Sequence, residues 1–281
     1  MTQPHATDRI PSNDVSIHFR RFGKPGRLPA LIVHGLSYFS WDWIPAGQAL
    51  AVDREVVAMD MRGFGDSSSS PGKDYSVPAM GQDIVNVLDY LRWSRAVLLG
   101  HSMGGRSTTY VAAKHPQKVA GLVLVDFTPE NAPAGSNRVS QAVANVPDSF
   151  DSIEAAMAYF GQTNRERFEH YLKRVDGRFA VKRDPHFRDQ FRKILQGGER
   201  PKLCVDVWQL IAEVRCPVLS MRGANSDMYA PETKEKMRAA NSRLAVVEVN
   251  AGHNIAGENL SGFLGALRPF LSSLEEKAHV R

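Results

Sequence analysis

The sequence is poor in cysteine and has no long hydrophobic run. Its two cysteines, Cys204 and Cys216, are too few for a disulfide scaffold and favour a reducing compartment. No stretch approaches the roughly 20 apolar residues that a membrane-spanning helix requires. The polar first ten residues also lack the apolar segment of a secretory signal. We therefore expect a cytoplasmic protein with no membrane partner.

Metal-binding and nucleic-acid-binding motifs are missing as well. C-x-x-C and H-E-x-x-H do not occur and the histidines are scattered singly, so we expect no metal and no cofactor. Residues 131–203 hold 13 lysines and arginines against 9 acidic residues and account for most of the net charge of +5. Bases and acids alternate there, which argues against nucleic acid as a partner. The excess is typical of a solvated helical surface and would also favour an anionic substrate. Nothing in the sequence indicates an oligomeric state.

What is present is an alternation of short apolar runs with helical patterns, over a length that suits one α/β domain. Runs typical of strands occupy 15–20, 30–33, 55–60, 96–99, 121–125, 217–221 and 244–249. Helical spacing is found at 77–91, 106–114, 152–160, 165–174, 186–195, 231–240 and 258–274. Continuous apolar strands separated by helices predict a mostly parallel central sheet flanked by helices. Residues 128–203 show no buried-strand run, so we expect a core at 1–127 and 204–281 with an inserted helical cap at 128–203.

The most informative motif is G-x-S-x-G around Ser102, which reads Gly100-His101-Ser102-Met103-Gly104. It follows an apolar run and precedes a helical pattern. A serine on such a strand-to-helix turn projects its hydroxyl from the edge of a sheet, and the N–H groups of the next helix point to the same place. The context therefore predicts a nucleophilic serine.

Partners for this serine follow other predicted strands, where sites form in an open α/β sheet. Asp126, Asp227 and His253 all lie just after strand ends. His253 can act as general base, and a carboxylate must hold its tautomer. The backbone N–H groups of Leu36 and Met103 are the candidate oxyanion donors.

Several motifs together resemble the α/β-hydrolase fold superfamily over nearly the whole chain. They are His34-Gly35, Asp60-x-Arg62-Gly63-x-Gly65-x-Ser67, Gly100-x-Ser102-x-Gly104 and Gly252-His253. The resemblance implies the α/β-hydrolase fold with a Ser/acid/His site, and it does not specify a substrate. Ser102 stands where the haloalkane dehalogenases and epoxide hydrolases carry aspartate. We expect His34, His18 and His101 to have no catalytic role, and Asp60 and Arg62 to hold a loop by hydrogen bonds.

The identity of the acid is open between two aspartates. Most members of the superfamily place it third after a glycine that follows the penultimate strand, but here Ser226 stands there and Asp227 comes one later. A minority place it after the preceding strand, at Asp126. The segment 100–129 is similar to the (E)-2-(acetamidomethylene)succinate hydrolases, which use the earlier acid. We therefore favour Asp126, with Asp227 as the alternative.

These features predict a serine hydrolase that cleaves a carboxylic ester, or an amide or lactone, of a small molecule through an acyl-serine intermediate. Hydrolysis of a C–C bond in ring-cleavage products uses a similar set of residues and is one alternative. A ligand-sensing receptor on the same fold is the other.

Overall fold

The computed structural model describes residues 5–201 and 203–279. Eight strands form one sheet in the order β1-β2-β4-β3-β5-β6-β9-β10. They are β1 (Ala6–Ser12), β2 (Val15–Phe22), β3 (Arg27–Val33), β4 (Arg54–Met59), β5 (Ala96–His101), β6 (Val119–Val125), β9 (Val218–Gly223) and β10 (Leu244–Val249). All pairs are parallel except those made by β2 with β1 and with β4. The predicted mostly parallel α/β architecture is confirmed.

All seven predicted strands form in this sheet. The first strand, β1, was not predicted. It is an edge strand that pairs only with β2, and most of its first half is exposed. Because one edge of it faces solvent, it tolerates Pro11 and lacks a continuous apolar run.

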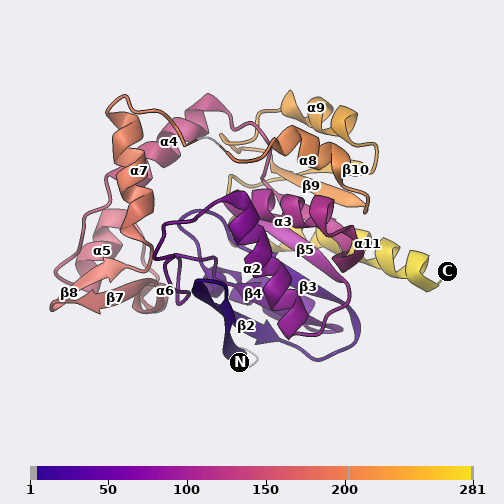
Figure 1. Ribbon diagram of the computed structural model, residues 1–281, viewed down its shortest axis with the longest axis horizontal. Coiled ribbons are helices and arrows are strands. Elements are labelled where there is room, and N and C mark those ends of the chain that lie inside the picture. Colours follow the sequence, from indigo (N-terminus) through magenta and orange to yellow (C-terminus); the bar gives the residue numbers. More distant parts are fainter. Residues whose placement is uncertain (1–4, 202, 280–281) are drawn as a thin grey trace.

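Helices connect the parallel strands and cover both faces of the sheet (Figure 1). Within the core these helices and short 3₁₀ turns are η1 (Ser40–Trp43), α1 (Ile44–Leu50), α2 (Val77–Tyr90), α3 (Met103–Lys114), η2 (Pro116–Lys118), α8 (Val207–Glu213), α9 (Thr233–Ala240), α10 (Ile255–Glu258) and α11 (Leu260–His279). None of the described helices is both long enough and apolar enough to cross a membrane.

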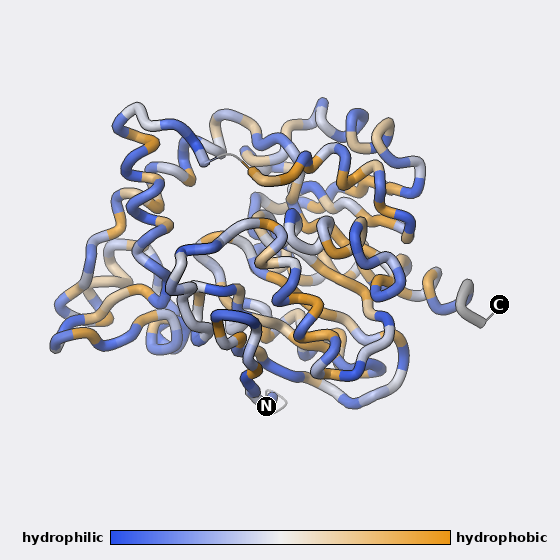
Figure 2. Tube along the Cα trace, viewed as in Figure 1, coloured by the Kyte–Doolittle hydropathy of each residue, from blue (hydrophilic) through white to orange (hydrophobic). Residues whose placement is uncertain are grey.

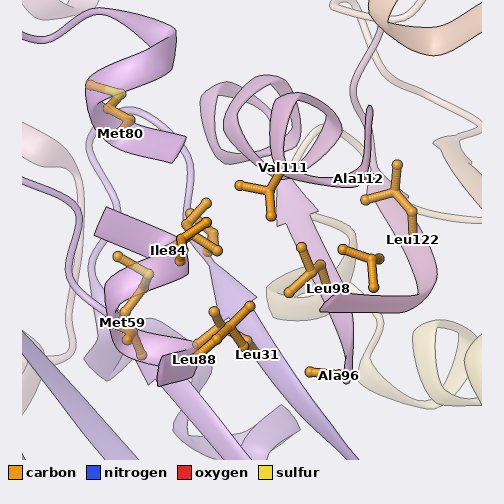
Figure 3. Packing of buried hydrophobic residues seen from close by; sticks show 14 of the residues in the cluster. Leu31, Met59, Met80, Ile84, Leu88, Ala96, Leu98, Val111, Ala112 and Leu122 are labelled. Atoms are coloured by element: carbon orange, nitrogen blue, oxygen red, sulfur yellow. The ribbon is translucent and has the colours of Figure 1, made fainter. Parts of the chain in front are cut away.

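Neighbouring residues of each strand enter different hydrophobic clusters, because strand side chains alternate between faces. Leu98 of β5 packs with the residues of α2 and α3, whereas Leu99 packs with those of α1 and α11. Figure 3 shows the first of these layers, with Ile84 of α2 and Val111 of α3 turned toward the strands. Hydrophobic residues run along the central strands, and hydrophilic ones mark many of the outer turns (Figure 2). Because helices cover both faces of the sheet, a site is expected at the edge where the parallel strands end.

The described part of 128–203, the segment predicted to be an inserted cap and called the cap below, lies to one side of the sheet, at the left of Figure 1. Its elements are α4 (Pro133–Ala144), α5 (Ile153–Phe160), α6 (Arg165–Tyr171), β7 (Leu172–Val175), β8 (Arg178–Val181) and α7 (Pro185–Leu195). The predicted helix at 165–174 is therefore wrong in its last three residues, which belong to a two-stranded hairpin. Asp176 and Gly177 make its turn with φ of 50° and 78°, a conformation that suits a two-residue hairpin loop.

Candidate active site

Ser102 occupies a strained turn between β5 and α3. Its backbone has φ 50° and ψ −117°, outside the regions that serine ordinarily adopts. Its N–H donates to the carbonyl oxygen of Val125 in β6 at 3.1 Å, which continues the parallel ladder one residue beyond β5. Strain of this kind costs about 1–3 kcal/mol and persists only where the surrounding structure holds it. The turn places the serine at the carboxyl edge of the sheet.

Glycines allow neighbouring backbone segments to pack closely around this turn. A Cβ atom on Gly104 would lie 2.3 Å from the carbonyl oxygen of Val33, which is shorter than any side chain tolerates. A Cβ atom on Gly35 would lie 2.9 Å from Cβ of Ser102. The loop after β3 therefore lies directly against the serine turn, as the His34-Gly35 and G-x-S-x-G motifs predicted.

Asp126 contacts His253 directly. Nδ1 of the histidine lies 2.6 Å from Oδ2 of Asp126, whose side chain is fully buried. The carboxylate also accepts hydrogen bonds from the backbone N–H of Gly223, at 2.8 Å, and from the hydroxyl of Ser226. An acceptor at Nδ1 places the proton of a neutral imidazole on that atom and leaves Nε2 as a base.

The alternative acid, Asp227, makes a different contact. Its two oxygens bind the guanidinium of Arg138 on α4 at 2.6 and 2.7 Å. This ion pair lowers the pKa of the Asp227 carboxyl, with burial opposing it. Of the two candidate aspartates, Asp126 is hydrogen-bonded to His253, whereas Asp227 is paired with Arg138 of the cap.

The loop that carries His253 is held from two sides. His101 donates from Nε2 to the carbonyl oxygen of His253 at 3.0 Å, and the two rings lie 4.8 Å apart. Glu258 accepts from the backbone N–H of Gly252 at 2.6 Å. Burial, and then the proximity of His253, lower the pKa of His101 well below its usual value, so it stays neutral. His101 thus holds the His253 loop by a hydrogen bond to its backbone, a positioning contact that the sequence analysis did not predict.

The predicted oxyanion donors, Leu36 and Met103, both line the cavity into which Ser102 opens. Within residues 5–201 and 203–279, neither backbone N–H has a hydrogen-bond partner. Met103 is the first residue of α3, where N–H groups have no intrahelical acceptor. Both donors are therefore free to bind an oxygen.

The cavity itself has a volume of about 1450 Å³ and is shared between core and cap. Ser102 and His253 come from the core, whereas Arg138, Arg167 and Phe160 come from the cap. Such a space accommodates a small-molecule ligand with room for water.

The remaining motif residues form a buried support for the site. Asp60 accepts from the backbone N–H of Ser40 at 2.5 Å and from Nδ1 of His18 at 2.8 Å, and Arg62 binds both oxygens of Asp83. The predicted loop-holding roles of Asp60 and Arg62 are thus confirmed. His18, Asp60 and Asp66 are also the described residues whose ligand atoms could together reach a metal ion. Their hydrogen bonds to one another and to the backbone account for this grouping without one.

His34 is fully buried and has a structural role. Nδ1 donates to the carbonyl oxygen of Gly35 at 2.8 Å, and Nε2 accepts from the backbone N–H of Met61 at 2.9 Å. Both ring nitrogens are therefore occupied, which agrees with the expectation that His34 is not a base.

The sequence reasoning missed two residues of the site. Ser226 stands where most superfamily members carry the acid, and its hydroxyl reaches Asp126. Its position third after Gly223 was the available signal. Glu258 had no signal, because its contact depends on how α10 begins.

Comparison with known proteins agrees with this fold. The family model described as the alpha/beta hydrolase fold matches residues 29–260. Esterase YbfF of Escherichia coli (strain K12) is 29% identical over 253 residues, which cover 87% of this chain and 93% of that protein. N-formylmaleamate deformylase of Pseudomonas putida is 28% identical over 276 residues, which cover 95% and 96%.

A solved structure, that of E-2-(acetamidomethylene)succinate hydrolase, is similar along the whole chain. It has a TM-score of 0.83 at 25% identity and covers 96% of this chain and 100% of that one. The resemblance stated for segment 100–129 is thereby confirmed.

Proposed function

The chain belongs to the alpha/beta hydrolase fold family, and from this premise we propose that it is a serine hydrolase of carboxylic esters or related amides and lactones. The observation that carries the proposal is the 2.6 Å contact between Nδ1 of His253 and the buried Asp126, at a cavity that Ser102 also lines. A serine hydroxyl is a weak nucleophile at neutral pH and needs such an oriented base.

The proposed reaction has two halves. Nε2 of His253 takes the proton of Ser102, whose oxygen attacks the carbonyl carbon and forms a tetrahedral intermediate. The C–O or C–N bond then breaks, and the imidazolium returns the proton to the departing alcohol or amine. Water, deprotonated by the same imidazole, attacks the acyl-serine. The second tetrahedral intermediate then breaks its bond to the Ser102 oxygen, which regains a proton from the imidazolium as the acid is released. Asp126 stabilises the imidazolium in both halves.

The N–H groups of Leu36 and Met103 bind the negative oxygen of each tetrahedral intermediate. One such donor typically lowers the barrier by about 2.7–4 kcal/mol. The cap, as the other wall of the cavity, shapes the space for a small-molecule acyl substrate and limits the water around it. Side chains and backbone of this chain, with water, suffice for these steps.

Covalent labelling tests the proposal. A fluorophosphonate probe should label the protein at Ser102, and p-nitrophenyl acetate should be turned over. Ser102→Ala should lose the label and lower kcat by roughly 10⁴-fold or more.

Ser107→Ala is the matched control. Ser107 also lines the cavity, but its hydroxyl contacts the sulfur of Met80 at 3.7 Å. It should keep both label and turnover. Stoichiometric labelling with no turnover of any acyl substrate would instead favour a receptor, and labelling that survives Ser102→Ala would overturn the assignment.

A further inference from the structure

Several cationic side chains line the cavity. Those among the described residues are Arg20, Lys73, Arg106, Arg138, Arg167 and Arg200. Most already have a partner within the protein. Arg138 binds Asp227, Arg167 binds Asp42 and Lys73 binds Asp184, each as an ion pair. A cation already paired with a carboxylate contributes little to a ligand.

The two other partnered arginines bind neutral groups. Arg20 donates to the hydroxyl of Ser40 at 3.2 Å and also contacts His5. Arg200 donates to the hydroxyl of Ser140 at 3.4 Å. Arg106 differs from all five, because its guanidinium makes no hydrogen bond or ion pair with any part of the chain that the structure describes.

The residues beside Arg106 supply no acid. The ring of Phe127 lies against Gly105, where a Cβ atom would approach it to 2.5 Å, and the hydroxyl of Ser107 faces Met80. Burial alone lowers the pKa of Arg106, with no neighbouring carboxylate to oppose it. For Arg138 the pKa is raised instead, because its guanidinium donates hydrogen bonds to the carboxylate of Asp227. A guanidinium remains charged throughout the ordinary pH range, so Arg106 is a partly buried cation that has no counterion among residues 5–201 and 203–279.

Arg106 also stands close to the reacting serine. It stands in the first turn of α3, which begins directly after Ser102, and both residues line the same cavity. The rise between them is about 6 Å, and helical side chains lean toward the N-terminus, here toward Ser102. An anion held by Arg106 therefore shares the cavity with a carbonyl held at Ser102.

We propose that Arg106 binds a carboxylate of the substrate, so that the enzyme prefers short acyl compounds whose acid part carries a second carboxylate. This inference rests on the proposed hydrolase function. The planar fork of a guanidinium matches two carboxylate oxygens, and such charge-assisted pairs are stronger than neutral hydrogen bonds.

The kinetic test compares monomethyl succinate with methyl butyrate, which has the same acyl length and no charge, by proton release at constant pH. Wild type should prefer the charged ester. Arg106→Gln should reduce the ratio of the two kcat/KM values by about 100-fold, mainly through KM of the charged ester. Arg106→Lys keeps the charge without the fork and should reduce it by about tenfold.

Arg138→Gln is the matched control, since Arg138 lines the same cavity but is already bound to Asp227. This variant should keep the ratio of the two kcat/KM values within about threefold of the wild-type ratio. A ratio that is unchanged in Arg106→Gln, or one that falls equally in Arg138→Gln, overturns the proposal.

A binding measurement separates this proposal from the hydrolase function. Malonate, succinate and glutarate are titrated by calorimetry into Ser102→Ala and into Ser102→Ala/Arg106→Gln, with thermal melting to establish that both are folded. At least one acid should bind the single variant and lose about 30-fold in affinity in the double variant. Equal affinities, or no binding of any of the three acids, overturn the proposal even if Ser102 proves to be the nucleophile. Binding that depends on Arg106 in a protein without ester turnover would support this site and contradict the hydrolase function.

Discussion

The carboxylate beside His253 is held by hydrogen bonds from three different kinds of donor. Asp126 accepts from a backbone N–H, a hydroxyl and an imidazole, and its own backbone has φ 45° at the end of β6. Ser226 fills the place where most of the superfamily carries the acid, and it donates to the acid that replaces it. The acid beside His253 therefore comes from the end of the neighbouring strand, β6. The hydroxyl of Ser226 is one of the donors to this acid.

A single substitution at Asp126 follows from this contact. Asp126→Asn should lower kcat by roughly 10⁴-fold, because an amide cannot hold the proton on Nδ1 of His253 or stabilise the imidazolium. Asp227→Asn removes the same charge from a residue bound to Arg138 and should keep kcat within about tenfold. Initial rates on p-nitrophenyl acetate distinguish the two. The assignment fails if Asp227→Asn is the inactive variant and Asp126→Asn is close to wild type.

His101 makes stability depend on pH. Its pKa in the folded protein lies well below the usual 6.5, so between the two values the unfolded chain binds a proton that the native chain does not. The free energy of unfolding should therefore fall as pH drops below about 6.5, by up to about 1.4 kcal/mol per pH unit from this site. Burial of His34 acts in the same direction.

Urea unfolding at pH 7.5 and 5.5 measures this loss. His101→Gln keeps an amide N–H that can donate to the carbonyl oxygen of His253 but has no proton to gain. Its stability should fall less between the two pH values than that of wild type. Equal losses in the two proteins would contradict the role given to His101.

At the scale of elements, sequence periodicity predicted the strands correctly where they are completely buried. Strands such as β5 and β6 are buried along their whole length, so their apolar runs were unambiguous. The hairpin of β7 and β8 is different, because each strand has four residues and β7 buries only Leu172. The helical spacing that begins at residue 165 therefore led to the prediction of a helix through residue 174, although Asp176-Gly177 is a strong hairpin signal.

Some features of the site could likewise be predicted from the sequence, and others could not. Ser102, Asp126 and His253 were predictable because each follows a strand, and parallel strands end at one edge. Which carboxylate meets His253 depends on the direction of two loops, and which arginine lacks a partner depends on every neighbouring acid. Neither property is local in sequence, so Ser226 and Arg106 emerged only from the assembled structure.

At the scale of the whole molecule, the hydrophobic interior is divided between sheet and cap. The two faces of the sheet have their own clusters, and a third, in the cap, comprises Phe39, Val146, Phe150, Ala156, Phe168, Tyr171, Leu172 and Val181. Only Phe39 comes from the core. The Arg167–Asp42 ion pair, with its shortest contact at 2.6 Å, ties α6 to η1 beside this cluster. The cap therefore has a cluster of its own, although Phe187 of α7 also packs on Phe64 and Tyr75 of the core.

This division predicts that the cap loses structure before the sheet does. Phe168 is fully buried in the cap cluster, and replacing phenylalanine by alanine in a core costs about 3–5 kcal/mol. Phe168→Ala should therefore weaken amide hydrogen-exchange protection at 146–181 and leave β5 and β6 as protected as in wild type. Leu98→Ala, in the sheet, should instead lower the protection of the most stable amides throughout. Because Ser102 and His253 stand on the sheet, the first variant should still react with a fluorophosphonate. A uniform loss of protection in Phe168→Ala would mean that cap and sheet unfold as one unit, coupled through contacts such as those of Phe187 with Phe64 and Tyr75.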